Sequence, residues 1–293
     1  MGKIAHDFAF SKVSQRDIVK VITKLKNKRS VGWDEIPTFI IKRIKHQISD
    51  ILCTLINFSL EKGQFPDQLK LAIVTPVFKK GNKAQLENYR PISVLSIFSK
   101  IFESVVNEQL TGYFEGFHLL TNNQFGFRQG FSTETALAYS IRAIADALDR
   151  SQATAGVYCD LSKAFDSVVH HILIQKLEYY GIKGNNLNWF RSYLRNRKQK
   201  TILFSNNIQY ESDWKRIELG VPQGSILGPT LFLVYINDLQ SKIDDNLTLY
   251  ADDTSVILKE PNIHILENKI IETILKLNEW FHSNGLQMNN TKS

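Results

Sequence analysis

Hydrophobic and polar positions along the chain follow two periods, which predict helices separated by short strands. Helical spacing of apolar residues begins after Ser14, a suitable helix N-cap, and recurs over residues 39–48, 51–61 and 98–114. An apolar run at residues 71–78 predicts a strand. The first third of the chain is therefore expected to be mainly helical.

The rest of the chain alternates more regularly between the two periods. Helices are predicted at residues 133–150, 170–180, 186–195 and 263–283, and strands at 156–160, 200–204, 247–250 and 255–258. Asn206 and Asn207 predict a turn, and a glycine-containing loop at 220–224 precedes an apolar helix that reaches about residue 239. Paired strands with helices between them predict an α+β fold, in which helices back an antiparallel sheet.

Two adjacent acids, Asp252 and Asp253, occupy the turn between the last two predicted strands. Adjacent carboxylates repel one another and resist burial unless a cation neutralises them. Aspartate is short and accepts hydrogen bonds, so it suits Mg²⁺, which prefers oxygen ligands. The alternative is a solvent-exposed Asp-Asp turn without a ligand, and the tetrapeptide alone does not separate these interpretations.

Asp160 adds a third acid at the end of the predicted strand 156–160. A strand-end carboxylate beside a hairpin-tip carboxylate makes a clamp for two metal ions roughly 3.5–4 Å apart. One ion would activate a primer 3′-hydroxyl, and the other would hold a triphosphate and stabilise the leaving pyrophosphate. The alternative for Asp160 is the N-cap of a following helix.

Five segments, in this order, resemble the motifs of reverse transcriptases. They are residues 88–93 (NYRPIS), 124–128 (QFGFR), 160–166 (DLSKAFD), 220–229 (GVPQGSILGP) and 250–253 (YADD). The first two resemble fingers motifs of the non-LTR and group II intron branch, and the last three resemble palm motifs. The resemblance covers essentially the whole chain and is strongest to the Jockey/CR1-type non-LTR elements of animals.

The resemblance implies that Asp160, Asp252 and Asp253 are the catalytic acids, with Asp252 mattering more than Asp253. It implies that these acids and the Leu161 carbonyl bind two Mg²⁺ ions, for which Mn²⁺ can substitute. Phe165 would be the steric gate, because a ring beneath the sugar leaves no room for a 2′-hydroxyl. Packing in the core is the alternative for Phe165.

Basic and glycine-containing segments supply the remaining predicted contacts with nucleotide. By resemblance, Gln223 and Gly224 contact the incoming nucleotide and the template–primer pair. Arg90 is expected on the triphosphate, since its guanidinium donates two parallel hydrogen bonds. Lys79 is expected there as well, although its neighbour Lys80 is an alternative.

A second set of basic residues is predicted to contact nucleic acid. Its members are Arg128, Arg191, Arg195 and Arg197. The last three surround Tyr193 and follow Trp189, which suits a surface that tracks phosphates and stacks on bases. The alternative is a solvated helix end. Near the chain end, Lys292 resembles the residue of the fourth palm motif that protonates the leaving pyrophosphate.

The family's fold and activity follow as expectations. The resemblance implies a right-hand polymerase with fingers at about 1–150, palm at about 151–293 and a fingers-like insertion near 185–215. Thumb and endonuclease segments are expected to be missing, as in a fragment or a decayed copy. The expected enzyme is an RNA-directed DNA polymerase that uses an RNA template, a DNA primer or target site and dNTPs for target-primed reverse transcription. It would work in a cytoplasmic ribonucleoprotein and in the nucleus.

Composition changes this interpretation little. A formal net charge of +7 over 293 residues suits a polyanionic partner, although many soluble proteins carry as much. No stretch is apolar enough for a membrane span, and Cys53 and Cys159 are expected to be reduced. Two rivals stay open: an RNA-dependent RNA polymerase, and a nucleic-acid-binding remnant without polymerase activity.

Overall fold

The computed structural model describes residues 6–28, 30–205 and 208–289. Its α-helices are α1 (Gln15–Lys24), α2 (Thr38–Arg43), α3 (Lys45–Lys62), α4 (Ile97–Gly116), α5 (Thr133–Asp149), α6 (His170–Tyr179), α7 (Gly184–Leu194), α8 (Leu227–Ile236) and α9 (Ile263–Ser283). Its strands are β1 (Leu71–Phe78), β2 (Tyr89–Leu95), β3 (Ala153–Cys159), β4 (Lys198–Ser205), β5 (Ile208–Glu211), β6 (Lys215–Arg216), β7 (Asn246–Tyr250) and β8 (Asp253–Glu260). Short 3₁₀ helices are η1 (Asp67–Lys70), η2 (Leu86–Asn88), η3 (Ala164–Asp166) and η4 (Asn237–Lys242).

The chain divides into two compact units, and each is assembled from two separate stretches of sequence. The first unit comprises Met1–Phe114 and Ile174–Gly228, and the second comprises Glu115–Leu173 and Pro229–Ser293. A sheet and helices occur in both units, so the mixed α+β class predicted from the hydrophobic pattern is confirmed.

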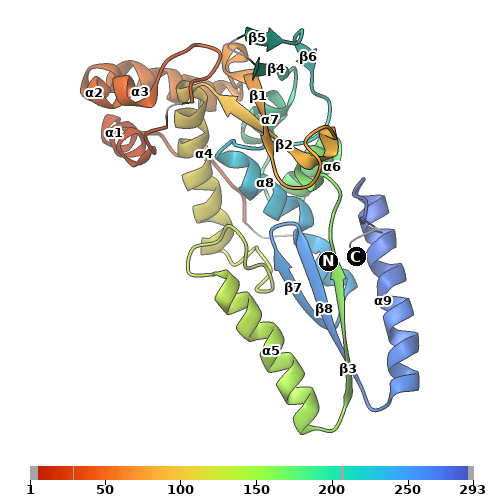
Figure 1. Ribbon diagram of the computed structural model, residues 1–293. Coiled ribbons are helices and arrows are strands. Elements are labelled where there is room, and N and C mark those ends of the chain that lie inside the picture. The colour runs from red at the N-terminus through yellow and green to blue at the C-terminus, as the bar shows by residue number, and fades with distance from the viewer. Residues whose placement is uncertain (1–5, 29, 206–207, 290–293) are drawn as a thin grey trace. The chain divides into compact units, whose positions relative to one another are not determined.

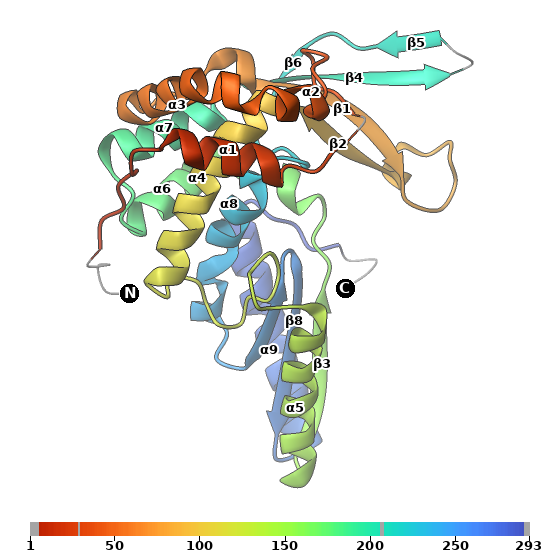
Figure 2. The ribbon, with the colours of Figure 1, turned by 90° about the vertical axis from the view of Figure 1, so that its left-hand side faces the viewer.

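The first unit packs helices beside a mixed sheet of strand order β2-β1-β4-β5, with β6 paired to β4. Strand β1 is antiparallel to β2 and parallel to β4. Helix α3 contacts both α1 and α7, as Figure 2 shows. Aromatic rings fill the core of this unit, where Phe65 meets Phe102, Trp189 and Tyr193 edge to face at 5.1–6.0 Å between ring centroids.

The second unit is built on an antiparallel three-stranded sheet of order β3-β8-β7. Helices α5 and α9 both contact this sheet, and Figures 1 and 2 show the sheet lying between them. Leu247, Val256 and Leu258 are buried completely. The predicted antiparallel sheet backed by helices is therefore present in this unit.

Two features of the fold differ from the sequence-based expectation. The helix predicted over residues 39–48 is broken at Ile44, whose backbone (φ −101°, ψ 16°) separates α2 from α3. Strand β2 was not predicted, because Pro91 lies within it and lacks an N–H for sheet pairing. Its position at the edge of the sheet tolerates the proline, which pairs with Pro76 of β1.

No helix within the described ranges is both long and apolar enough to cross a membrane.

Candidate active site

The hairpin of β7 and β8 carries the two adjacent acids at its tip. Pairing closes at Tyr250 and Asp253, which leaves Ala251 and Asp252 as the two central residues of the turn. Ala251 has φ 57°, a left-handed conformation at the first central position that two-residue hairpin turns use. Ala251 is buried, Asp252 is half-buried and Asp253 is exposed. The predicted hairpin is therefore confirmed, with its acids at the turn.

Strand β3 brings Asp160 to the same end of the sheet. Its last pair joins Cys159 to Thr254 of β8, so Asp160 follows directly opposite Asp253. Asp160 and Asp253 also line one cavity of about 460 Å³, together with Tyr250 and residues of α5. Two acids that are far apart in sequence are thus brought together, whereas Asp252 does not line this cavity.

Asn289 holds the backbone and the side chain of Asp160. Its N–H donates to the Asp160 carbonyl at 2.8 Å, and its side-chain Nδ2 donates to Asp160 Oδ2 at 3.1 Å. Leu161 pairs with Met288 in a single antiparallel bridge. The hydrogen bonds of this bridge use groups of the residues on either side, so the pairing does not consume the Leu161 carbonyl. Lys292 lies outside the described residues.

The donor atoms at this end of the sheet suit a hard divalent cation. Carboxylate oxygens of Asp160 and Asp253, with Asp252 in the adjacent turn and the Leu161 carbonyl, are the ligand type that Mg²⁺ prefers. Among the described residues, no three His, Cys, Asp or Glu side chains come close enough to hold an ion by themselves. The chemistry of the residues fits Mg²⁺, and substrate oxygens or water would complete its coordination.

Phe165 lies in the second unit, in the short helix η3 that follows β3. Its ring stacks on Phe232 at 4.6 Å between centroids and meets Phe127 edge to face at 6.2 Å. Phe165 is half-buried, so part of its surface is accessible. The packing interpretation is therefore correct for one face of the ring, and its role as a steric gate stays a prediction.

The predicted nucleotide-binding residues of the first unit lie on the β1–β2 hairpin or on the loop that contacts it. Arg90 pairs with Val77 across β1 and β2, and the Lys79 N–H donates to the Asn88 carbonyl at 2.8 Å. Further along β2, the Ser93 N–H donates to the Gln223 carbonyl at 2.7 Å. A Cβ on Gly224 (φ 116°) would come within 2.5 Å of the Ser93 carbonyl, so this close approach requires glycine.

A buried carboxylate, which the sequence did not single out, supports the loop that carries Gln223. Glu103 of α4 accepts hydrogen bonds from the Ile226 N–H at 2.7 Å and the Tyr193 hydroxyl at 3.0 Å. Burial raises the pKa of Glu103, while the Arg197 charge and these hydrogen bonds oppose the rise. Its helix also carries Lys100, Glu108 and Glu115, so nothing in the sequence distinguished Glu103 from a solvent-exposed acid.

Two residues predicted to contact nucleic acid, Arg197 and Arg128, have side chains that are buried against partners within the protein. Arg197 is 1% exposed, with its guanidinium 4.7 Å from the centre of the Tyr193 ring. The Arg128 side chain is 6% exposed and forms a two-pronged ion pair with Glu115 at 2.7–2.8 Å. Each arginine lies beside a buried or half-buried acid, and its contact with nucleic acid stays a prediction.

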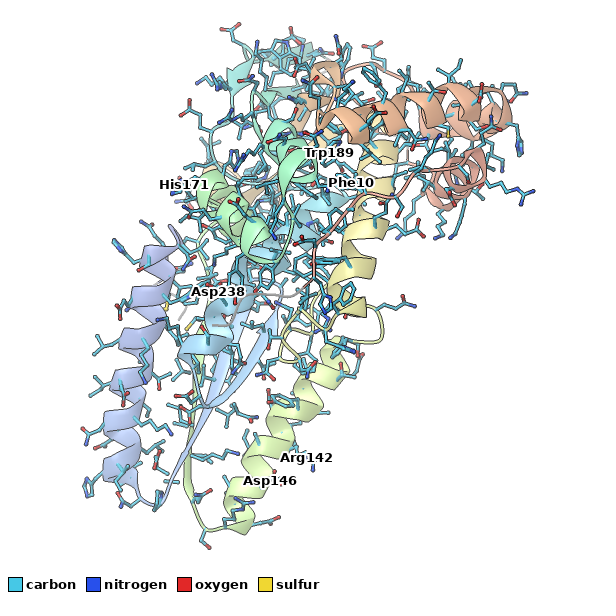
Figure 3. The ribbon with its side chains drawn as sticks, turned by 180° about the vertical axis from the view of Figure 1, so that it is seen from behind. Phe10, Arg142, Asp146, His171, Trp189 and Asp238 are labelled. Carbon is cyan, nitrogen blue, oxygen red and sulfur yellow. The ribbon has the colours of Figure 1, made fainter. Side chains whose placement is uncertain are left out.

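The predicted stacking partners also lie in the core. Trp189 and Tyr193 are completely buried and stack on each other at 5.6 Å between ring centroids. Phe10 packs against the edge of Trp189 (Figure 3), so the indole is not accessible to a base. Arg195 is exposed and Arg191 half-buried, and both border a cavity of about 1180 Å³ in the first unit. Their contact with nucleic acid stays a prediction.

Comparison with known proteins agrees with the motif pattern. The family model described as reverse transcriptase (RNA-dependent DNA polymerase) matches residues 78–293. The chain is 30% identical to a probable RNA-directed DNA polymerase from transposon BS and 28% identical to that from transposon X-element, both of Drosophila melanogaster. Each alignment covers 94% of this chain and 31% of the relative, so the chain spans about a third of their length.

A further relative agrees with this grouping, and a solved structure shares the fold. The polymerase of the Drosophila melanogaster mobile element jockey is 27% identical over 96% of this chain and 31% of its own length. A structure of telomerase from Candida albicans resembles the fold with a TM-score of 0.51 and 13% identity, over 78% of this chain and 44% of that one. This chain belongs to the reverse transcriptase (RNA-dependent DNA polymerase) family.

Proposed function

We propose that this chain is the polymerase domain of a non-LTR retrotransposon protein, and that it copies RNA into DNA by adding dNMPs to a primer 3′-hydroxyl. One observation carries the proposal: strand pairing sets Asp160 opposite Asp253, beside the turn that holds Asp252. Such a group of carboxylates at one sheet end supports phosphoryl transfer with divalent ions. The family match and the similarity to transposon polymerases support the same activity.

Each group would have a distinct role in the reaction. Asp160, Asp252, Asp253 and the Leu161 carbonyl would hold two Mg²⁺ ions, or Mn²⁺ in their place. These ions, when bound, lower the pKa of the attacking hydroxyl and neutralise charge on the leaving pyrophosphate. The exposed Arg90 and Lys79 would bind the triphosphate, because cations on one hairpin can contact several of its oxygens.

Selection of deoxynucleotides would depend on Phe165. Its ring is braced by Phe232 and Phe127, so it cannot turn aside easily to admit a 2′-hydroxyl. We propose that the β3-β8-β7 sheet belongs to the palm and the β1–β2 hairpin to the fingers. The partners would be an RNA template, a DNA primer or target site and dNTPs, for target-primed reverse transcription in the nucleus.

Primer extension on an RNA template, with dNTPs and Mg²⁺, tests this proposal. The chain should extend the primer, and Asp252→Asn should reduce the rate at least about 100-fold, or about 2.7 kcal/mol in activation free energy. Asp146→Asn is the matched control, because Asp146 is an exposed aspartate of α5 in the same unit (Figure 3). Equal extension by the wild-type and Asp252→Asn proteins would favour a remnant without polymerase activity.

The choice of nucleotide separates the second candidate, an RNA-dependent RNA polymerase. The wild-type chain should prefer dNTPs, and Phe165→Ala should relax that preference while leaving dNTP incorporation measurable. A clear preference of the wild-type chain for NTPs would contradict the assignment as a DNA polymerase.

A further inference from the structure

Gln124 contacts the turn that carries the proposed catalytic acids. It approaches this turn from the β7 edge of the sheet, whereas Asp160 follows β3 at the other edge. Its side chain is buried, with the residue 1% exposed. The Oε1 atom accepts hydrogen bonds from the Ala251 N–H at 3.0 Å and the Gly126 N–H at 2.8 Å. The Nε2 atom donates to the Ala251 carbonyl at 3.4 Å. One amide side chain therefore satisfies both backbone groups of the residue that precedes Asp252.

The chain around Gln124 runs as a short additional strand beside β7. The Phe125 N–H donates to the Leu249 carbonyl, and the Leu249 N–H donates to the Asn123 carbonyl, both at 2.8 Å. A Cβ on Gly126 would come within 2.3 Å of the Ala251 nitrogen. The absence of a side chain at Gly126 is thus what lets this segment approach the turn.

Arg128 fixes this segment in turn. Its Nη1 donates to the carbonyls of Thr121 at 2.7 Å and Gln124 at 3.3 Å. The ion pair with Glu115 at the end of α4 holds the guanidinium in place. The side chains of Gln124 and Arg128 therefore form one connected support, which runs from Glu115 to the backbone of Ala251.

The turn needs such a support. Ala251 occupies the left-handed region, which residues with a Cβ adopt rarely, and nothing in its own methyl side chain can hold it there. Rotation at Ala251 would move the carboxylate of Asp252, which is the next residue in the turn, whereas Asp253 is already held by its pairing with Tyr250. Hydrogen bonds to both its N–H and its carbonyl fix the peptide planes on either side of this residue.

We propose that Gln124 is a positioning residue, which sets the orientation of Asp252 beside Asp253 by clamping Ala251 and thereby sets the affinity of the site for divalent metal. The proposal rests on the function proposed above. Gln124 touches neither substrate nor metal in this role, and acts through the backbone of the turn.

The first test replaces the clamp with an apolar side chain of similar length. Gln124→Met should speed hydrogen exchange of the Ala251 and Gly126 amides by about tenfold, because both lose their acceptor. The Val256 amide of β8 should be unaffected. Mn²⁺ binding, measured by the paramagnetic signal of the free ion, should weaken about tenfold or more, as for other groups that orient metal ligands. Gln129→Met, at an exposed position of the same loop, is the matched control.

Kinetics on the same variants separate positioning from simple destabilisation. In primer extension by Gln124→Met, the Mg²⁺ concentration for half-maximal rate should rise about tenfold, while the KM for the primer–template stays within about twofold. A purely structural role would lower the amount of folded enzyme and leave the Mg²⁺ midpoint of the remainder unchanged.

A second variant tests the hydrogen bond to the Ala251 carbonyl. Its result does not depend on whether Gln124→Met folds. In Gln124→Glu, an ionised carboxylate still accepts from both N–H groups but places a second oxygen against the Ala251 carbonyl. Protonation restores a donor there, so the activity of the variant relative to wild type should rise as pH falls from about 8 to about 6. A relative activity that does not change with pH would overturn the clamp.

The outcomes also distinguish this proposal from the function on which it rests. If the wild-type chain extends no primer, while Gln124→Met still frees the Ala251 amide and weakens Mn²⁺ binding, the polymerase assignment fails and the clamp stands. If the wild-type chain is active, and Gln124→Met changes neither Mn²⁺ binding nor amide exchange, the clamp is wrong.

Discussion

Arg195 and Arg197 are two residues apart and carry the same charge, yet their surroundings differ completely. Arg195 is exposed, whereas Arg197 is 1% exposed and acts on the buried carboxyl of Glu103. A sequence pattern of cations and aromatic rings cannot distinguish the two, because burial depends on how the chain turns between α7 and β4. Stability measurements can distinguish the two arginines, because replacement of Arg197 should destabilise the protein and replacement of Arg195 should not.

We predict that Arg197→Met lowers the free energy of unfolding by about 3–5 kcal/mol at neutral pH, because it leaves the buried Glu103 without its cation. Burial raises the pKa of Glu103 above its ordinary 4.5, so the folded state binds this proton more tightly than the unfolded state. Stability from this group is therefore full below about pH 4.5 and is lost as pH rises through the folded pKa. Without Arg197 the pKa rises further, so the destabilisation should shrink in acid.

Urea unfolding across this pH range checks the prediction. Arg195→Met is the control and should change stability by no more than about 0.5 kcal/mol. A stable Arg197→Met protein that binds nucleic acid poorly would instead restore the surface role first predicted for Arg197.

Residue chemistry within the motifs was predictable from sequence, and the residues that support them were not. The order of the motifs predicted Asp160 and the Tyr250–Asp253 hairpin, which strand pairing places at one sheet end. Gln124, Glu103 and Asn289 had no assignable role, because each acts through contacts with chain segments more than 120 residues away. Such contacts are decided by tertiary pairing rather than by local pattern.

Among whole elements, periodicity succeeded where one face of the segment is buried. The long helix predicted at 263–283 coincides with α9, and the strand predicted at 71–78 coincides with β1. Periodicity failed at Ile44, because an apolar run does not show where a helix breaks. It also failed at β2, because a proline within a segment argues against a strand even though an edge strand tolerates it. Strand β3 begins earlier than predicted, at Ala153, because its first three residues are all half-buried and show no alternation.

Cys159, the last residue of β3, offers a chemical probe of the β3-β8-β7 sheet. Burial raises the pKa of this thiol to about 11, from an ordinary value of 9.0. At a pH below both values, the thiolate fraction of Cys159 is about 100-fold smaller than that of a thiol with the ordinary pKa. Iodoacetamide should therefore label Cys159 at least about 100-fold more slowly than it labels glutathione. Peptide mass spectrometry separates Cys159 from Cys53. Labelling of Cys159 as fast as glutathione in the folded protein would show that this thiol is not buried as described.

At the scale of the whole molecule, the net charge of +7 says little until the positions of the charges are known. Exposed cations gather where β4 meets β6: Lys198 pairs with Arg216, and Lys215 lies beside it. Other lysines are already matched by acids, as when Lys20 and Lys24 of α1 share Glu108 at 3.4 Å. The β4–β6 cations are therefore the stronger candidates for contact with phosphates.

We predict that Lys215→Gln with Arg216→Gln weakens binding of an RNA–DNA duplex and flattens its salt dependence. Each lost phosphate contact should reduce the slope of log K against log [salt] by about 0.7–0.9, because fewer counterions are released on binding. Lys20→Gln with Lys24→Gln removes the same total charge from α1 and should leave the slope nearly unchanged. Fluorescence anisotropy over a salt titration measures both slopes. If the salt-dependence slope falls equally in the two double variants, then net charge governs binding and the β4–β6 cations have no special role. A long-range electrostatic field depends on the total charge, so it would weaken equally in both variants.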